Sequence, residues 1–355
     1  MLELELKHRQ GAFALEASLR VAARGVTVLV GESGSGKTTL LRLVAGLARA
    51  ADGFIRVGDV TWFDAARGVC VPARERSIGY VAQDHALFPH LGARDNVAFG
   101  LHASGVPARE AAARAQAALD RMGIGELASR LPGEMSGGQA QRVAIARAIV
   151  LEPAVLLLDE PLASLDVATR RAIRGELRRL LAALPCLTLH VTHSPAEALA
   201  LGDEIVVLEN GRVSQRGTRD ELMRHPRSAY VAEFLGLNLF RGRFEANVPP
   251  GARSLALPLG QLVLADDGDV TALVHPRDIT LSRTPPEGTA RNVFSGVIDE
   301  LAPEPPAGEL VRVSLGGELP LIAEVTRSAV ESLALTPGAR VYASFKAAGV
   351  QVLRD

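Results

Sequence analysis

A glycine-rich segment, GESGSGKTTL, begins at Gly31 and has the residue types that bind phosphate. It fits the pattern G-x-x-x-x-G-K-[ST], follows an apolar run over 26–30 and precedes a helical run, which is the context that the pattern requires. In such a loop the backbone N–H groups and the helix N-terminus bind phosphate oxygens. A glycine-rich turn that matches by chance is the alternative. The predicted nucleotide contacts are Gly31, Glu32, Ser33, Gly34, Ser35, Gly36, Lys37, Thr38 and Thr39.

Within this loop, Lys37 and Thr38 have separate expected roles. We expect Lys37 to reach the β- and γ-phosphates and the Thr38 hydroxyl to ligate Mg²⁺. Asp159 and Glu160 end the apolar run AVLLL, and an acid at the carboxyl end of such a strand faces the crevice where ligands bind. Asp159 is therefore predicted to be a Mg²⁺ partner, mostly through water, and Glu160 to polarise the attacking water. The alternative is that the acidic pair only terminates the strand.

Two histidines, His190 and His193, lie in the next apolar run, LTLHVTH. Residues three apart on a strand point to opposite faces, so these two side chains cannot easily share one metal ion. His193, at the end of the run, is predicted to contact the γ-phosphate instead.

The elements that position these residues follow from the apolar pattern. Up to about residue 235, short apolar runs alternate with helical stretches, which indicates a mainly parallel sheet. A stretch rich in Ala and Arg within about 89–150 predicts a helical insertion between two strands. Asn210-Gly211 separates two apolar runs and predicts a β-hairpin. The segment 1–10 alternates apolar and charged residues, which predicts a strand and not a signal peptide.

Composition limits the class of protein. A chain of 355 residues exceeds the usual size of one hydrophobic core, so we expect two units. Because 39 basic residues balance 40 acidic ones, nothing favours a nucleic-acid partner. No apolar run approaches the roughly 18 residues that span a bilayer. Cys70 and Cys186 have no C-x-x-C spacing, which predicts a reducing compartment and two buried thiols.

Four further motifs resemble those of the ATP-binding cassette (ABC) family. Ser136, Gly137, Gly138 and Gln139 resemble the family's signature sequence, at the start of a predicted helix. Gln83 resembles the glutamine that senses Mg²⁺ and the permease, the run SLD ending at Asp166 resembles a dimer-interface loop, and His193 matches the switch histidine. The resemblance covers about 235 residues. It implies a head-to-tail homodimer in which each signature closes on the ATP and Mg²⁺ held by the other copy, with Glu160, His193 and Gln83 as catalytic residues.

One position departs from this family pattern. Many importers of the family place an aromatic residue before a glycine near the N-terminus, where it stacks on adenine. Here Gln10 precedes Gly11, and Phe13 follows three residues later. Phe13 either stacks on the base or belongs to the core.

After residue 240 the pattern changes to short strands with period two, as in VRVSLGGELPLIAEV and VYASF, with one helix expected near 327–335. Together with ARNVFSGVI, these segments resemble the small molybdate-binding (Mop) barrel of molybdate importer ATPases. The expected fold is thus an α/β P-loop nucleotide-binding domain with a helical subdomain and an antiparallel β part (1–235), a linker and first β segment (236–288), and a small all-β, OB-like barrel (289–355). Arg291, Asn292 and Lys346 are the candidate ligands of molybdate or tungstate, and the alternative role of the barrel is dimerisation.

The resemblance implies a peripheral ATPase on the cytoplasmic face of the inner membrane. Its partners would be a membrane permease and, indirectly, an external molybdate-binding protein, with no nucleic acid involved. Tungstate, sulfate, iron or a sugar is the alternative cargo, and a molybdate-sensing barrel that inhibits the ATPase could coexist with import. A soluble ATPase acting on chromosomes or ribosomes is disfavoured, because the chain has one P-loop, one signature and no sustained heptads.

Overall fold

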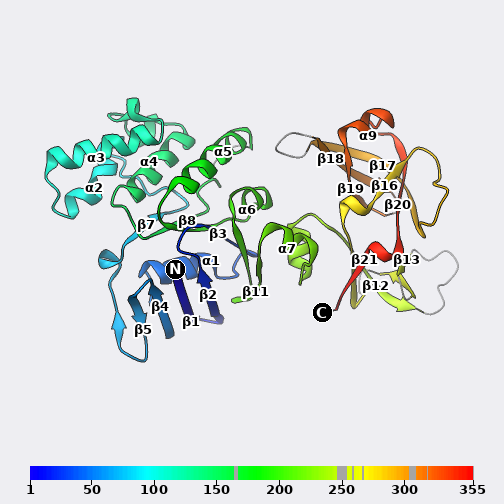
Figure 1. The fold of residues 1–355 in the computed structure, drawn as a ribbon, viewed down its shortest axis with the longest axis horizontal. Helices are drawn as coiled ribbons and strands as arrows, with labels where there is room; N and C mark the ends of the chain where they lie inside the picture. The colour runs from blue at the N-terminus through cyan, green and yellow to red at the C-terminus, as the bar shows by residue number, and fades with distance from the viewer. Residues whose placement is uncertain are drawn as a thin grey trace. The chain divides into compact units, whose positions relative to one another are not determined.

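The computed structural model describes residues 1–163, 167–245, 254–257, 260–265, 268–303, 309–317 and 319–354. The chain divides into two compact units, Met1–Arg224 and His225–Asp355. Figure 1 shows helices and strands mixed in the first unit and mainly strands in the second. No helix in the described ranges is long and apolar enough to cross a membrane.

The first unit is built on an eleven-stranded sheet in the order β6-β5-β4-β1-β2-β11-β10-β3-β9-β8-β7. The strands β10, β3, β9, β8 and β7 are parallel neighbours, and the strands from β6 to β2 pair antiparallel. The bounds are β1 Leu2–Gln10, β2 Phe13–Val21, β3 Gly25–Val30, β4 Asp52–Val57, β5 Val60–Asp64, β6 Val69–Cys70, β7 Ile78–Val81, β8 Val155–Asp159, β9 Leu187–Val191, β10 Glu204–Glu209 and β11 Arg212–Gly217.

Side-chain pattern explains this division of the sheet. Every residue of β8 and β9 is buried, as expected for parallel strands covered on both faces. In β1 the leucines at positions 2, 4 and 6 are buried while Glu5 is exposed, which is the alternation of a strand with one covered face. The predicted strands are thereby confirmed. The sheet is not mainly parallel, because five of the ten pairings between its described strands are antiparallel; the parallel half carries the strands predicted between helices, and the antiparallel half is the predicted antiparallel β part.

Helices connect these strands. Helices α2, α3 and α4 lie between β7 and β8 in the chain, and α2 contacts both of the others (Figure 1). The helices of this unit are α1 Lys37–Ala45, α2 Ala93–Ala103, α3 Ala108–Arg121, α4 Gly137–Ile149, α5 Val167–Ala183, α6 Pro195–Leu201 and α7 Arg219–Arg224.

Two local predictions have clear outcomes. The hairpin is confirmed: β10 and β11 pair antiparallel, and Asn210 and Gly211 both have positive φ, at 49° and 76°, as a type I′ turn requires. The prediction of two buried thiols was wrong for one of them. Cys186 is buried, but Cys70 is exposed, because it ends the two-residue strand β6 at the edge of the sheet.

The second unit contains two five-stranded sheets, in the orders β13-β14-β12-β15-β21 and β16-β20-β17-β18-β19. All pairings are antiparallel, and one shared core that includes Phe240, Ile298 and Phe345 holds the unit together. The elements are α8 Ala229–Phe234, β12 Asn238–Glu245, β13 Ser254–Leu257, β14 Gly260–Leu264, β15 Val270–Val274, β16 Thr280–Ser282, β17 Asn292–Pro303, β18 Leu310–Gly317, β19 Leu321–Thr326, α9 Arg327–Ser332, β20 Arg340–Phe345 and β21 Val350–Arg354.

The last strand of the chain belongs to the first of these sheets. β21 pairs with β15, so residues 350–354 complete a sheet whose other strands come from residues 238–274. The amide of Asn238 adds a second link, donating to the Val274 carbonyl at 3.2 Å and to the Ile322 carbonyl at 2.8 Å. The expected linker and barrel segments are therefore joined by a common sheet. The predicted β character of this part of the chain is confirmed.

Candidate functional site

The glycine-rich loop joins β3 to α1 and turns sharply before the helix. Gly34 and Gly36 have φ of 81° and 104°, where a side chain is disfavoured. A Cβ on Gly36 would also lie 2.7 Å from Phe13 Cζ, so the ring lies against the loop. Phe13 is half-buried and packs on the core of the first unit, which supports the core alternative for this residue.

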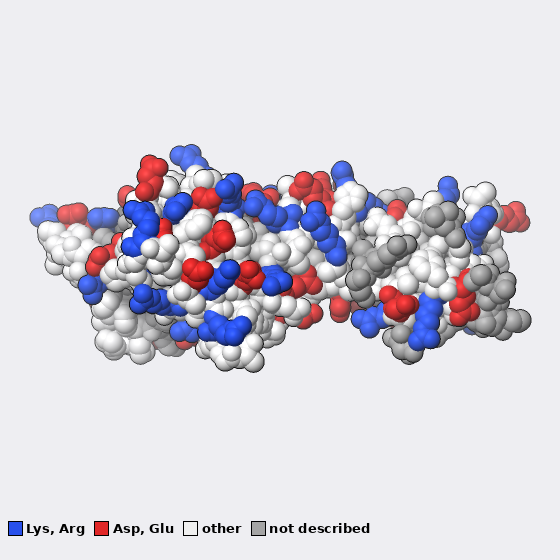
Figure 2. All heavy atoms as spheres, turned by 90° about the horizontal axis from the view of Figure 1, so that it is seen from below, with Lys and Arg blue, Asp and Glu red and all other residues white. Residues whose placement is uncertain are grey.

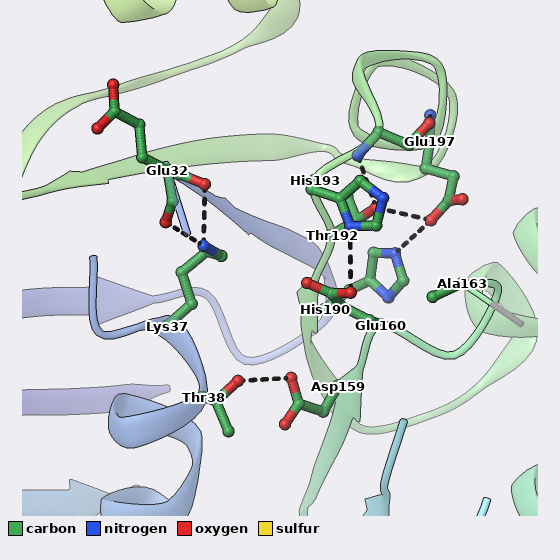
Figure 3. A network of polar contacts seen from close by, with 12 residues as sticks. Glu32, Lys37, Thr38, Asp159, Glu160, Ala163, His190, Thr192, His193 and Glu197 are labelled. Carbon is green, nitrogen blue, oxygen red and sulfur yellow. Dashed lines mark hydrogen bonds and ion pairs between the residues drawn. The ribbon is translucent and has the colours of Figure 1, made fainter. Parts of the chain in front are cut away.

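Lys37, the first residue of α1, folds back over the loop (Figure 3). Its Nζ donates to the backbone carbonyls of Gly31 at 2.9 Å and Glu32 at 2.7 Å. Burial lowers the pKa of Lys37 below its ordinary value, and the nearby carboxylates of Glu160 and Asp159 oppose that shift. The only cation of the loop is therefore held against the loop's own backbone, and it belongs to the first residue of α1, whose N-terminus favours a bound phosphate.

Asp159, the last residue of β8, lies beside the end of the glycine-rich loop. Its carboxylate accepts a hydrogen bond from Thr38 Oγ1 and another from the Tyr80 hydroxyl, each at 3.1 Å. Burial raises the pKa of Asp159 above its ordinary value, although both of these hydrogen bonds lower it. Burial also raises the pKa of Tyr80, and the Asp159 charge adds to that shift.

This donor set fits Mg²⁺. The structure brings together one carboxylate and one hydroxyl, and no cluster of three or more His, Cys, Asp or Glu side chains that could hold a metal occurs among the described residues. Mg²⁺ usually takes one or two protein oxygens and completes its shell with phosphate oxygens and water. Thr38 and Asp159 would hold it in that way, beside the phosphates of the nucleotide.

Replacing Asp159 by asparagine should raise stability while it removes a metal ligand. A carboxyl whose folded pKa lies above its unfolded value opposes folding once pH exceeds the unfolded value, and that loss of stability is removed as pH falls through the folded pKa. We expect the melting temperature of the nucleotide-free Asp159→Asn protein at pH 7 to rise by about 2–4 °C, the shift that roughly 1 kcal/mol produces in a domain of 150–250 residues.

The gain should shrink as pH falls toward the ordinary carboxyl pKa, because the wild-type side chain is then protonated as well. Asp59→Asn, at an exposed carboxylate between β4 and β5 of the same unit, is the control and should leave the melting temperature unchanged. A lower melting temperature for Asp159→Asn would show that the folded protein stabilises the charge of Asp159.

Glu160 and His193 form a pair beyond the strand ends. Their side chains are 3.1 Å apart, between Glu160 Oε2 and His193 Nδ1 (Figure 3). Glu160 has a φ of 47°, a strained value for a residue with a side chain, and its backbone N–H donates to the Val191 carbonyl at 3.0 Å. The Glu160 side chain is 21% exposed and that of His193 is 59% exposed, so both groups can reach a bound molecule.

A polar network that includes Thr192, Glu197 and His190 surrounds the chain next to His193. Thr192 Oγ1 donates to Glu197 Oε2 at 2.8 Å and accepts from the backbone N–H of Ser194 at 3.0 Å. His190 is fully buried, with Nε2 3.6 Å from Glu197. Burial alone would raise the pKa of Glu197, but its contacts with His190 and Thr192 lower it below the ordinary value. His190 and His193 thus contact different acids, Glu197 and Glu160.

Gln83 lies two residues beyond the end of β7 and is exposed. In the same loop, His85 and Ala86 have positive φ, at 62° and 46°. Arg147 of α4 holds both, donating to their backbone carbonyls at 2.8 and 2.7 Å, and its guanidinium lies 5.7 Å from the ring centroid of Phe88. Arg147 therefore ties the Gln83 loop to the helix that begins at the signature sequence.

Ser136 is the N-cap of α4. Its hydroxyl accepts from the Gln139 N–H at 3.3 Å, while the Gln139 side chain accepts from the Ser136 N–H at 2.9 Å, which is a capping box. Ser136 and Gly137 are exposed, and Gly138 is buried. Among the described residues no hydrogen bond or ion pair joins this segment to 31–39. Asp166 lies outside the described residues.

The three candidates in the second unit lie at the ends of two neighbouring strands. Asn292 pairs with Phe345 in the β17–β20 register, which places Arg291 and Lys346 next to one another just beyond the strands, both exposed. Asn292 is 1% exposed and is already bonded: its amide accepts from the Ala256 N–H at 2.7 Å and donates to the Ala256 carbonyl at 3.0 Å.

The surface charge is mixed. Figure 2 shows Lys and Arg interspersed with Asp and Glu over one face of the molecule.

Family models match both parts of the chain. Residues 15–163 match the ABC transporter model, and residues 288–352 match the TOBE domain model. The first match contains the glycine-rich loop, Gln83, the signature sequence and the acidic pair. The second contains all three strand-end candidates.

Individual relatives extend over more of the chain. A molybdenum import ATP-binding protein, ModC, of Thiobacillus denitrificans is 40% identical over 347 residues, covering 94% of this chain and 93% of that protein. A protein of Rhizobium etli named Fe(3+) ions import ATP-binding protein FbpC is 45% identical over 244 residues, covering 68% of this chain and 65% of that protein. A solved dimeric structure of the ATP-binding cassette MJ0796, described as a post-hydrolysis state with ADP and phosphate, has 28% identity and a TM-score of 0.51, covering 61% of this chain and 98% of that one.

Proposed function

The chain belongs to the ATP-binding cassette family of transporter ATPases, and from that premise we propose that it hydrolyses ATP to drive the import of molybdate. The reaction converts ATP and water to ADP and phosphate while molybdate passes from outside to inside. The carrying observation is the relative named as a molybdenum import protein, whose similarity extends over 94% of the chain.

In this proposal the loop binds the triphosphate and positions it for attack. Backbone N–H groups of Gly34 to Thr38 and the N-terminus of α1 bind the β- and γ-phosphates, and Lys37 exchanges its two carbonyl partners for phosphate oxygens. Mg²⁺, held by Thr38 and Asp159, would neutralise negative charge on the phosphates. Because Thr38 and Asp159 are already hydrogen-bonded to one another, little rearrangement is needed to bring both to the metal.

Glu160 and His193 act at the γ-phosphate in this proposal. Glu160 accepts a proton from the attacking water, and His193 hydrogen-bonds to the γ-phosphate and to Glu160, which keeps the carboxylate oriented. The network of Thr192, Glu197 and His190 fixes the turn that carries His193. Gln83 reports the state of the site to the permease through its exposed loop.

The signature sequence completes the site of a second copy. Ser136 and Gly137 at the start of α4 are exposed and suited to an anion, yet no described bond joins them to the loop of their own chain. We propose that they contact the γ-phosphate bound by the partner copy, with the Asp166 segment crossing between the two. The similar cassette of solved structure is a dimer, which supports this arrangement.

The cargo assignment rests on the second unit. The iron-import relative covers 68% of the chain, whereas the molybdenum-import relative covers 94% and so includes most of His225–Asp355. The similarity to an importer of another cargo therefore extends over a smaller share of the chain. We propose that the protein lies on the cytoplasmic face of the inner membrane and binds permease subunits, with an external molybdate-binding protein delivering the cargo.

Deleting the gene in the source organism tests the cargo. At nanomolar molybdate, uptake of labelled molybdate should be lost, restored by the wild-type gene and not restored by a Lys37→Ala gene. Uptake of iron and sulfate should not change. Loss of iron or sulfate uptake with normal molybdate uptake would reject the cargo while leaving the ATPase assignment intact.

The strand ends of the second unit supply a candidate oxyanion contact. We propose that Arg291 and Lys346 bind molybdate or tungstate, while Asn292, bonded to Ala256, holds the strands that carry them. Two exposed cations side by side suit a dianion. The alternative is that this edge joins two copies of the chain.

Calorimetric titration of the full-length protein distinguishes these two roles. Molybdate and tungstate should give saturable heat that is lost in Arg291→Ala/Lys346→Ala and kept in Arg327→Ala, an exposed arginine of the same unit. Binding should weaken by about tenfold or more, since a charge-assisted hydrogen bond contributes about 1.5–3 kcal/mol. If neither anion gives heat, and the double variant forms a smaller fraction of dimer than the wild type, the dimer role is favoured.

A further inference from the structure

A cavity of about 480 Å³ lies between α4 and α5 in the first unit, and no residue of the glycine-rich loop lines it. Pockets that bind small molecules usually enclose about 300–1,000 Å³. Six aliphatic side chains line it: Ile145 and Ile149 of α4, Ile173, Leu177 and Leu180 of α5, and Leu184 just beyond it. The cavity therefore suits an apolar body.

One polar side chain in the wall has no partner. Gln141 of α4 is fully buried, and neither its amide nitrogen nor its amide oxygen has a hydrogen-bond partner in the described part of the chain. Buried side-chain amides are nearly always hydrogen-bonded, since an unpaired one loses its bonds to water without replacement. Gln141 lines the cavity, and a rotation of its amide toward the cavity would let a ligand donate to its oxygen and accept from its nitrogen.

The charged residues of the cavity favour an anion. Arg142 is already bonded to Glu176 and to the Met122 carbonyl. Arg121 and Arg179 also line the cavity, are exposed, and take part in no ion pair among the residues that the structure describes. With one arginine neutralised by the one acid, the other two leave the cavity positively charged.

We propose that this cavity binds a small amphipathic anion. The apolar body of the ligand packs against the aliphatic wall, a polar group bonds to Gln141, and the acidic group lies by Arg121 and Arg179. The proposal goes beyond ATP hydrolysis and molybdate import: molybdate has no apolar body, and the triphosphate of ATP has its own loop. The N-cap of α4 is Ser136, and α5 follows the strand that ends in Asp159, so a ligand between them contacts two helices that are each connected to the proposed hydrolytic site.

Two matched fluorescent probes test the chemical class. Anilinonaphthalene sulfonate and N-phenyl-1-naphthylamine share the same aromatic body, and only the first carries a sulfonate. Titrations use the full-length protein with excess ADP, which fills the nucleotide site, and direct excitation of the probe. The sulfonate probe should bind once per chain and about tenfold more tightly than the neutral one, the gain expected from a hydrogen bond to a charged group. Arg121→Gln/Arg179→Gln should abolish that difference.

The position of the site is tested by a pair of variants on α5. Ala183 lines the cavity and is exposed, whereas its exposed neighbour Ala182 does not line it. Ala183→Trp should reduce binding of the sulfonate probe at least tenfold, and Ala182→Trp should bind as the wild type does. Gln141→Leu should weaken the sulfonate probe and raise the melting temperature of the free protein, because it removes an unpaired amide. Equal binding of both probes to the wild type, or unchanged binding to Ala183→Trp, would overturn the proposal.

Discussion

Glu160→Gln should bind ATP as tightly as the wild type and hydrolyse it at least about a hundredfold more slowly, the contribution expected of a general base. The substitution keeps the size of the side chain and its contact with His193, which is 3.1 Å away, but removes the group that accepts a proton from water. Phosphate release under saturating Mg-ATP measures the rate, and a filter or fluorescence assay measures ATP binding. In the cycle that the proposed shared site implies, ATP closes the dimer and hydrolysis opens it, so the variant should accumulate as an ATP-bound dimer.

Glu126→Gln is a matched control, since Glu126 is an exposed acid of the same unit. It should hydrolyse ATP at the wild-type rate. Normal hydrolysis by Glu160→Gln would remove Glu160 from its proposed role and leave its positive φ without a catalytic explanation.

Ser136→Arg should abolish hydrolysis while leaving ATP binding to the single chain nearly unchanged. The arginine would occupy the space in front of the exposed N-terminus of α4, where the proposal places the γ-phosphate of the other copy. Binding of ATP by the chain's own loop should be nearly unaffected, because no hydrogen bond or ion pair in the described part of the chain joins the two segments. We expect a fall in the rate of about a hundredfold or more, as for loss of a preorganised anion contact.

Ser129→Arg serves as the control, because Ser129 is exposed and lies in the same part of the chain, outside the signature sequence. Its rate should equal that of the wild type. If Ser136→Arg also hydrolyses ATP normally, the shared site is wrong, whatever the outcome for Glu160.

The residues that the sequence predicted well are those with a local pattern. Gly31 to Thr38 form a loop whose strand, turn and helix are contiguous, so its context could be read without knowing the fold. Asp159 was placed correctly for a similar reason: an all-apolar run ending in an acid predicts a buried parallel strand with the acid at its edge. The turn at Asn210 and Gly211 was also fixed locally, by the need for positive φ.

The residues that the sequence did not predict act across long separations. Tyr80 bonds to Asp159 because β7 pairs with β8, and Arg147 reaches the carbonyls of His85 and Ala86, about sixty residues earlier. Pairing of the strand before Gln83 with the strand that ends in Asp159 could have suggested Tyr80, because Tyr80 lies on the first of these strands. No local pattern in the sequence indicates the role of Arg147. Such contacts depend on the register of strands and the packing of helices, which a single sequence constrains weakly.

Asn292 illustrates the same limit in the second unit. Its place in a motif suggested an anion ligand, yet its amide closes a pair of hydrogen bonds with the Ala256 backbone, 36 residues earlier. An asparagine that bonds to a distant strand cannot be distinguished by spacing from one that faces a ligand. The neighbours Arg291 and Lys346, which are exposed, keep the proposed role.

Cross-linking between two differently tagged copies tests the shared site most directly. One copy carries Ser33→Cys in the glycine-rich loop and the other Ser136→Cys, both with Glu160→Gln to hold ATP and with Cys70→Ser to remove the exposed native thiol. With Mg-ATP and a short bifunctional maleimide, the account predicts a covalent species that contains both tags and does not form without nucleotide. A third variant carries both cysteines in one chain. If the cross-link forms within that chain, and the two tagged copies give no species with both tags, the shared site is contradicted.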